Sequence, residues 1–132
     1  MYLLDTNVCI RFLNKSSPGL ILKLFGTDPD EIFLCSIVKA ELFYGAHKTN
    51  NPLKTLKAQK EFCNRFKSLP FDDSAAEIYG EIRSSLEKKG RIIGPNDLII
   101  ASIAKTNNLI LIPHNGKEFN RIEGLTVEDW QE

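Results

Sequence analysis

The 132-residue sequence has no apolar run near the roughly 18 residues that a membrane-spanning helix needs. Asp5 interrupts the apolar start of the chain, so we expect no secretory leader. Cys9, Cys35 and Cys63 are odd in number and form no Cys-x-x-Cys pair, which excludes a readable disulfide framework or zinc site. We therefore expect a cytoplasmic protein, not associated with a membrane, whose thiols are buried.

The sequence also lacks net charge, because 17 basic residues balance 17 acidic ones. Its ordinary composition, 42% hydrophobic and 26% charged, predicts one folded domain over residues 1–132 rather than a disordered chain. The charge is nevertheless uneven: residues 39–67 hold seven Lys or Arg against two Glu, and residues 118–132 hold five acids against one Arg. This distribution allows an anionic ligand on one face of a neutral protein.

Short apolar runs alternate with helical patterns along the chain. Strands are expected at residues 2–4, 32–35 and 109–112, with a further short one at 125–127. Helices are expected after the capping cluster at residues 5–7 and over residues 20–25, 36–48, 52–67 and 72–89, with a last one opening at 94–96. This alternation, without hairpin signals, predicts an α/β fold: a three-layer α/β/α domain with a short, mainly parallel central sheet.

Asp5 directly follows the first predicted strand. Ligands of α/β folds bind at the carboxyl ends of the strands, which makes this position a functional candidate. An aspartate here is also an ordinary helix N-cap. Thr6 and Asn7 can cap a helix equally well, so capping alone does not require the acid. Both interpretations of Asp5 stay open.

Two further carboxylates lie on apolar faces of predicted helices. Glu41 shares a helical face with Ile37 and Tyr44, and the residues three and four positions after Asp97 are apolar. A carboxylate near an apolar face costs several kcal/mol unless a cation or hydrogen-bond donors meet it. The structural alternatives are a Glu41 that pairs with a cation at the edge of the face and an Asp97 stabilised by the helix dipole.

No Lys or Arg accompanies these three acids on their own faces. Carboxylates that converge without basic partners repel one another unless a hard cation neutralises them. Mg²⁺ and Mn²⁺ prefer oxygen ligands and keep water molecules for a phosphate substrate. Such a site can orient a phosphate, generate hydroxide and stabilise a leaving alkoxide. Asp5, Glu41 and Asp97 are therefore candidate ligands of a divalent cation.

Other polar residues are weaker candidates. In the turn after the strand at 109–112, Asn115 could orient a metal-bound water and Glu118 could hold one in an outer shell, although an ordinary turn explains both. His114 in this turn is expected to be a solvated loop residue. Three lysines at helical spacing could contact a nucleic-acid backbone, or simply form a solvated helix face: Lys54, Lys57 and Lys60.

Four motifs in order resemble the PIN-domain ribonucleases and, within them, the VapC toxins of bacterial toxin–antitoxin pairs. They lie at residues 2–7, 36–46, 94–101 and 115–130. The resemblance implies a PIN fold and an Mg²⁺- or Mn²⁺-dependent endoribonuclease that cleaves structured RNA such as transfer RNA. It makes Asp5, Glu41 and Asp97 the metal-site carboxylates. The residues that would support them are Thr6, Asn7, Asn115 and Glu118.

The resemblance also implies partners. A cognate antitoxin would lay an amphipathic segment over the cleft and send a basic side chain toward the carboxylates. A homodimer is expected through apolar residues of the first helices, such as Phe12 and Leu24, with a higher assembly formed by the antitoxin. The sequence departs from the family pattern at Pro113, where a Thr or Ser is usual, and at Asn115, where some relatives carry Asp. Proline supplies neither a hydroxyl nor a backbone N–H.

Two other classes remain as alternatives. The first is a PIN module that binds RNA or protein without cleaving, which Pro113 favours and which a loss of metal affinity would reveal. The second is a phosphoacceptor receiver domain, which is also α/β with an acidic pocket. That class needs adjacent acids after the first strand and a lysine after a late one, whereas Asp5 stands alone and Pro113-His114 occupies the late position.

Overall fold

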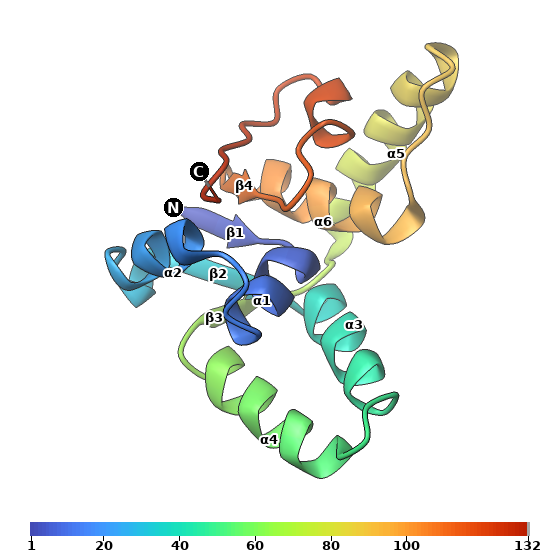
Figure 1. The fold of residues 1–132 in the computed structure, drawn as a ribbon. Helices are drawn as coiled ribbons and strands as arrows, with labels where there is room; N and C mark the ends of the chain where they lie inside the picture. Colours follow the sequence, from blue (N-terminus) through green and yellow to red (C-terminus); the bar gives the residue numbers. More distant parts are fainter. Residues whose placement is uncertain (132) are drawn as a thin grey trace.

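The computed structural model describes residues 1–131, which form a parallel sheet between two layers of helices (Figure 1). The four strands are β1 (Tyr2–Leu4), β2 (Ile32–Cys35), β3 (Lys67–Leu69) and β4 (Ile110–Ile112). The α-helices are α1 (Thr6–Leu13), α2 (Pro18–Phe25), α3 (Ser36–Ala46), α4 (Pro52–Cys63), α5 (Asp73–Lys88) and α6 (Pro95–Thr106). Two short 3-10 helices lie at Pro29–Glu31 and Phe119–Arg121. The expected three-layer α/β/α architecture is confirmed.

The strand order is β3-β2-β1-β4, and every pair of neighbours is parallel. Leu3 of β1 is paired with Phe33 of β2 on one side and with Leu111 of β4 on the other. The chain therefore moves outward from β1 through β2 to β3 and then returns to the opposite side of β1. Such a reversal opens a crevice at the carboxyl ends of the two strands that flank it, here β1 and β4.

Local signals explain where the helices begin and end. Ser17, Asn51 and Asp72 each accept a hydrogen bond from the backbone N–H three residues further on, as N-caps do. Proline occupies the first position of α2, α4 and α6, where its missing N–H costs nothing. Gly90 follows α5 with φ of 67°, a left-handed conformation that glycine adopts without strain.

The core lies on both faces of the sheet. Leu3, Leu4 and Leu111 are fully buried, as expected for strands covered on both sides. Helix α6 is central, because its Ile100 and Ile103 are also fully buried. The three cysteines are buried and free, as expected. No helix within residues 1–131 is both long and apolar enough to cross a membrane.

The segment after residue 124 returns to the outer edge of β4. The Leu111 N–H donates to the Thr126 carbonyl at 2.9 Å, and the Glu128 N–H donates to the Leu111 carbonyl at 3.0 Å. Trp130 is 1% exposed; its ring meets Tyr2 edge-on at 4.8 Å between centroids, and its Nε1 donates to Glu128 Oε1 at 2.8 Å. This segment therefore covers the edge of the sheet and closes the core beside β1.

Two predictions of secondary structure are wrong. The helix expected to run to about residue 67 ends at Cys63, and residues 67–69 form β3, which pairs with β2. Asn64 caps α4 through its backbone N–H, and the chain turns there. The strand expected at residues 125–127 is a single parallel bridge between Val127 and Leu111. Both errors concern the margins of the sheet, where pairing rather than local pattern decides the conformation.

The two residues that were expected to be exposed at a dimer face are buried or half-buried instead. Leu24 is 2% exposed and belongs to the core, while Phe12 is half-buried against it. The apolar side chains that α2 exposes are Leu22 (75%) and Phe25 (66%). Helical periodicity identifies an apolar face but does not say which of two adjacent apolar positions points inward.

Candidate active site

Asp5 lies where the crevice between β1 and β4 opens. Only 5% of the residue is exposed. Its Oδ1 accepts a hydrogen bond from the Val8 N–H at 2.8 Å, and its Oδ2 accepts one from the His114 N–H at 3.2 Å. The first bond caps α1 and the second joins the end of β1 to the turn after β4. Asp5 is therefore a helix cap whose carboxylate is also fixed at the candidate site.

His114 contributes through its backbone, which residue-type reasoning missed. Its side chain is exposed, as expected, with Nδ1 3.0 Å from Gln131 Oε1. The N–H that reaches Asp5 could come from any residue except proline, so no sequence signal marks it. Pro113, the departure from the family pattern, is buried immediately before it. The turn after β4 thus holds Asp5 without a hydroxyl at position 113.

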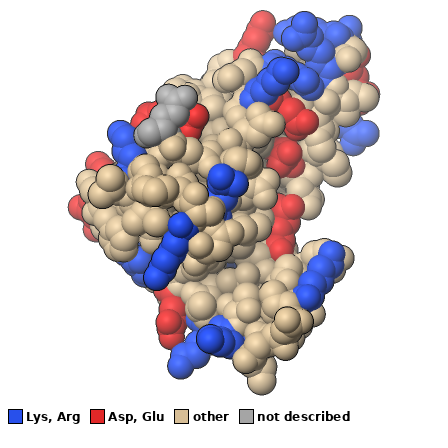
Figure 2. Space-filling model, in the orientation of Figure 1, with Lys and Arg blue, Asp and Glu red and all other residues tan. Residues whose placement is uncertain are grey.

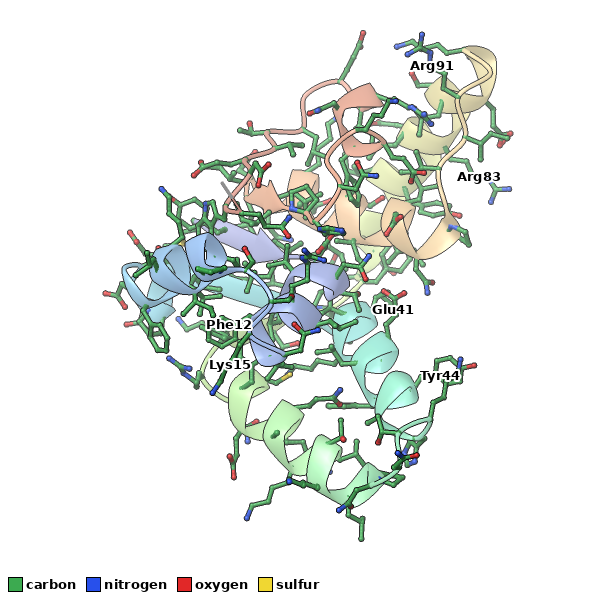
Figure 3. All side chains as sticks on the ribbon, in the orientation of Figure 1. Phe12, Lys15, Glu41, Tyr44, Arg83 and Arg91 are labelled. Atoms are coloured by element: carbon green, nitrogen blue, oxygen red, sulfur yellow. The ribbon has the colours of Figure 1, made fainter. Side chains whose placement is uncertain are left out.

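Glu41 is joined to α1 by Thr6, whose hydroxyl donates to Glu41 Oε1. The buried side of α3 is formed by Val38, Leu42 and Ala46. Tyr44 lies on the same side of α3 as Glu41, but that side is not packed against the core as expected, because Tyr44 is 64% exposed. Glu41 is half-buried at the edge of the buried stripe, and its side chain extends from α3 toward α6 (Figure 3).

Asp97 lies in the first turn of α6 and is half-buried. Burial raises the pKa of its carboxyl above the ordinary value, and the negative charges of Glu118 and Glu41 raise this pKa further. Asp97 is in turn one of the charges that raise the pKa of Asp5. The end of β1, the middle of α3, the start of α6 and the turn after β4 thus bring these four carboxyl groups into one electrostatic cluster.

Burial is the main reason that the pKa of Asp5 rises from 3.8 to about 6. The backbone hydrogen bonds from Val8 and His114 oppose this rise, the charge of Asp97 adds to it, and the charge of the His114 side chain opposes it slightly. Within residues 1–131 the salt bridges are Arg83–Glu87 and Lys89–Glu123, away from the cluster. Within the described residues, no Lys or Arg forms a salt bridge with the cluster, and Figure 2 shows a row of acidic side chains running upward from α3 on this face of the molecule.

The donor set of this cluster fits a hard divalent cation, because it consists of carboxylate oxygens without a basic counterion. In the described residues, however, no three acidic, His or Cys side chains are close enough to share an ion as they stand. Both oxygens of Asp5 accept backbone hydrogen bonds, and Glu41 is held by Thr6. The cluster therefore has the ligand atoms of a cation site, but hydrogen bonds from Val8, His114 and Thr6 hold the Asp5 and Glu41 carboxylates in their present positions.

Of the other residues predicted to support the site or to bind RNA, most lie outside the acidic cluster. Glu118 is half-buried and near enough to Asp97 to raise the pKa of that group. Asn7 is exposed in the first turn of α1. Asn115 is exposed and its Oδ1 accepts the Lys117 N–H at 3.2 Å, as in an ordinary turn. The predicted lysines lie on α4, which packs on α3 away from α6 (Figure 1); they are Lys54, Lys57 and Lys60.

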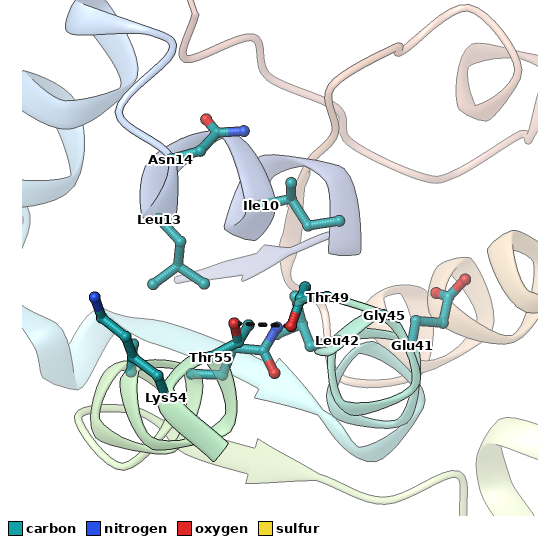
Figure 4. Close-up of a pocket in the computed structure, with 11 residues that line it drawn as sticks. Ile10, Leu13, Asn14, Glu41, Leu42, Gly45, Thr49, Lys54 and Thr55 are labelled. Atoms are coloured by element: carbon teal, nitrogen blue, oxygen red, sulfur yellow. Dashed lines mark hydrogen bonds between the residues drawn. The ribbon is translucent and has the colours of Figure 1, made fainter. Parts of the chain in front are cut away.

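A groove of about 620 Å³ opens between α1, α3 and α4 (Figure 4). Its lining is mainly apolar, with Glu41 at the end nearer the acids and Lys54 on α4. Gln59 also lines the groove; it is 8% exposed, and its Oε1 accepts no hydrogen bond within the described residues. This oxygen is buried behind the lining, so it is not available to a molecule in the groove without movement of the Gln59 side chain.

The raised pKa of Asp5 predicts how the stability of the metal-free protein depends on pH. The unfolded chain releases this proton near pH 3.8, whereas the native state holds it to about pH 6. Between these two pH values the native state binds more protons than the unfolded chain does. The stabilisation by the Asp5 proton is therefore complete below pH 3.8 and is lost as the pH rises through about 6. We expect acidification from about pH 7.5 to about pH 5 to stabilise the wild type by roughly 1 kcal/mol more than Asp5→Asn.

Urea unfolding in EDTA at several pH values measures this difference. Using Asp5→Asn as the reference removes the contributions of the titrating groups that do not interact with Asp5. Equal pH dependence in the two proteins would contradict a raised pKa at Asp5.

The PIN domain family matches residues 2–125. The chain therefore belongs to the PIN-domain family, which confirms the family resemblance and excludes a receiver domain. Among curated relatives it is 37% identical to the tRNA(fMet)-specific endonuclease VapC of Shigella flexneri, over 98% of this chain and 97% of that one. It is 39% identical to Ribonuclease VapC2 of Rickettsia felis, over 98% of both chains.

Solved structures show the same likeness. The chain matches VapBC2 from Rickettsia felis, bound to a DNA fragment from its promoter, with a TM-score of 0.88 and 39% identity over 98% of both chains. It matches DNA-bound VapBC from Salmonella typhimurium with a TM-score of 0.92 and 36% identity, over 98% of this chain and 97% of that one. The fold is thus shared over nearly the whole length with relatives that are named nucleases.

Proposed function

We propose that this protein is a VapC-like toxin: a Mg²⁺-dependent endoribonuclease that hydrolyses phosphodiester bonds and is inhibited by an antitoxin. The observation that carries the proposal is the buried carboxylate of Asp5, which has a raised pKa and shares with Asp97 an acidic cluster that forms no salt bridge with Lys or Arg in the described residues. The names of the curated relatives, all ribonucleases or endonucleases, support the reaction class.

Asp5 and Asp97 would hold the ion directly, and Glu41 would hold it directly or through water. Bound there, Mg²⁺ (or Mn²⁺ in its place) supplies a water activated for in-line attack and charge stabilisation of the leaving oxygen. The N–H groups of Val8 and His114 orient the Asp5 carboxylate, and Thr6 orients Glu41. Asn115 and Glu118 would orient solvent at the rim of the cluster. Cleavage would leave a 3′-hydroxyl and a 5′-phosphate.

Structured RNA, with transfer RNA favoured, is the proposed substrate. The support is the name of the Shigella flexneri relative, a tRNA(fMet)-specific endonuclease. Lys54, Lys57 and Lys60 would contact the RNA backbone without reading its sequence. Because α4 lies across the groove from the acids, such contacts would involve RNA that extends beyond the cleaved segment. The proposed compartment is the cytoplasm, where this substrate is found.

Incubation of a total transfer RNA pool with the purified protein tests the reaction. Discrete fragments that form with Mg²⁺ and disappear with EDTA are expected, and mapping of their ends gives the bond that is cut. Intact RNA from a folded protein that still binds Mg²⁺ would point to another RNA target. Absence of both cleavage and metal binding would favour the alternative of an inactive module that binds RNA or protein.

The groove between α1, α3 and α4 is the proposed docking site of the antitoxin. The solved structures similar to this chain include VapBC complexes, which supports a protein partner. An amphipathic segment fits the mainly apolar lining of the groove. Glu41 belongs to both the groove and the acidic cluster, so a basic side chain of the segment could reach the carboxylates from there. A complex that left Asp5 and Asp97 open would overturn this placement.

Gly45 offers a way to block the groove without disturbing the fold. It lies within α3 and lines the groove, and a Cβ added there meets nothing within 4 Å. We expect Gly45→Phe to weaken inhibition by the antitoxin at least about tenfold, because the ring occupies the partner's space, while RNA cleavage is retained. Inhibition curves with purified antitoxin measure the effect.

Gly80 is the matched control for this variant. It is exposed within α5, and a Cβ added there also meets nothing within 4 Å. Gly80→Phe should leave inhibition unchanged. If Gly45→Phe is inhibited as well as Gly80→Phe, the antitoxin binds elsewhere.

We further propose a homodimer, joined by the antitoxin into a higher assembly. With Leu24 buried, the side chains available on α2 are Leu22 and Phe25. Their exposed apolar surface is the candidate contact, and sedimentation of Leu22→Glu compared with the wild type tests it.

A further inference from the structure

Tyr44 is a large aromatic side chain that the fold does not use. It is 64% exposed on α3, three residues after Glu41, and Figure 3 shows it at the end of α3 beyond Glu41. Residues three apart on a helix are neighbours on its surface. Lys48, in the turn that follows α3, places its Nζ 4.2 Å from the centre of the Tyr44 ring. An aromatic ring and a cation therefore stand together beside a carboxylate of the candidate active site.

Tyr44 lies on the flank of α3 that is opposite to the groove. Leu42, Gly45 and Thr49 line the groove, whereas Tyr44 and Lys48 do not. Glu41 separates the two sides, since it belongs to the groove lining and also raises the pKa of Asp97. A partner confined to the groove would leave Tyr44 uncovered. The Tyr44 ring is instead open to a ligand that approaches the acids from solvent.

The pair has the chemistry of a platform for single-stranded nucleic acid. Such platforms combine an exposed aromatic ring, on which a base stacks, with a cation that meets the backbone. Stacking tolerates any base because every base has a π-face. Tyr44 remains mostly exposed even with Lys48 over its ring, so surface is left for a base. Lys48 forms no salt bridge within residues 1–131, which leaves its charge for a phosphate.

We propose that Tyr44 stacks on an unpaired RNA base next to the bond that is cut, and that Lys48 contacts the phosphate beside that base. This inference rests on the proposed ribonuclease function and adds to it a requirement for unpaired nucleotides at the cleavage site. Stem regions cannot offer a base to the ring, whereas loops can. The platform selects loops over stems and leaves the choice of base open.

Binding measured without cleavage tests the platform. A fluorescein-labelled hairpin RNA with an unpaired loop and a blunt duplex of the same stem serve as probes, and EDTA prevents hydrolysis. Tyr44→Ala should weaken binding of the hairpin roughly tenfold and binding of the duplex less than about twofold. Tyr44→Phe should bind the hairpin as the wild type does, because the ring is kept. Lys48→Met should weaken both probes and lower the salt dependence of binding.

Leu53→Ala is the matched control, since Leu53 is an apolar residue of α4 that is 81% exposed. It should bind both probes as the wild type does. Equal loss of hairpin and duplex binding in Tyr44→Ala, or no loss at all, would overturn the platform. Unchanged RNA binding combined with weaker antitoxin inhibition would assign Tyr44 to the protein partner instead. A wild type that binds the hairpin but cleaves no RNA contradicts the nuclease and leaves the platform standing.

Discussion

Asp5→Asn should lower RNA cleavage by roughly three orders of magnitude, and Asp97→Asn should do the same. The amide has almost the shape of the carboxylate but lacks the negative charge that a divalent cation requires. At position 5 the amide oxygen can still accept the Val8 N–H and cap α1. Its NH₂ group would then face the His114 N–H, so the turn after β4 loses one hydrogen bond. Initial cleavage rates at saturating Mg²⁺ measure the loss.

Asp72 provides a control for the loss of a capping carboxylate. Its Oδ1 accepts the Ala75 N–H at 2.9 Å at the start of α5, a cap like that of Asp5 at α1. Asp72→Asn should therefore cleave RNA at a rate close to that of the wild type. Retention of more than about a tenth of the activity by a folded Asp5→Asn protein would remove Asp5 from the site, since loss of a metal ligand costs several kcal/mol in the transition state.

Trp130→Ala should lower the free energy of unfolding by roughly 3–5 kcal/mol, the usual cost of removing a buried Trp or Phe ring. The side chain is 1% exposed, packs edge-on against Tyr2 and donates to Glu128. In a domain of this size the expected fall in melting temperature is roughly 10–20 °C. Urea unfolding followed by circular dichroism measures the loss without depending on the tryptophan signal.

Phe25→Ala is the comparison for this change, because Phe25 is an aromatic residue that is 66% exposed. Its loss should cost about 1 kcal/mol or less, since little buried surface is removed. A similar small loss in Trp130→Ala would show that the segment after residue 124 does not close the core in solution.

The parts of the fold that could be predicted are those with local signals. Capping residues, prolines at helix starts and continuous apolar runs located most helices and the strands β1, β2 and β4. Strand β3 was missed because two of its three residues, Lys67 and Ser68, are exposed and polar. The spacing of Phe62 and Phe66, both buried, also continued the helical pattern past the real end of α4. An edge strand of this kind takes its conformation from its neighbour, which local sequence does not encode.

In the candidate site, too, the features with a signal in the local sequence could be predicted and the others could not. The rule that ligands bind at strand ends placed Asp5 at the crevice, and helical spacing oriented Asp97. The backbone donors of Val8 and His114 could not be predicted, because an N–H carries no residue-type signal. The exposure of Tyr44 was also missed. Periodicity gives the angle of a residue around a helix, whereas the surrounding elements decide which angles are covered.

The segment that returns to β4 has a consequence for how the protein behaves at high concentration. β4 and the residue before it form an uninterrupted apolar run, Leu109–Ile112, of the kind that readily joins an intermolecular sheet. The carbonyl and N–H of Leu111 would offer such a sheet its first hydrogen bonds, but Thr126 and Glu128 already occupy both. The chain thus supplies its own blocking strand on this side. Proteolysis near residue 124 would therefore expose this edge of β4 and make the chain prone to aggregate through it.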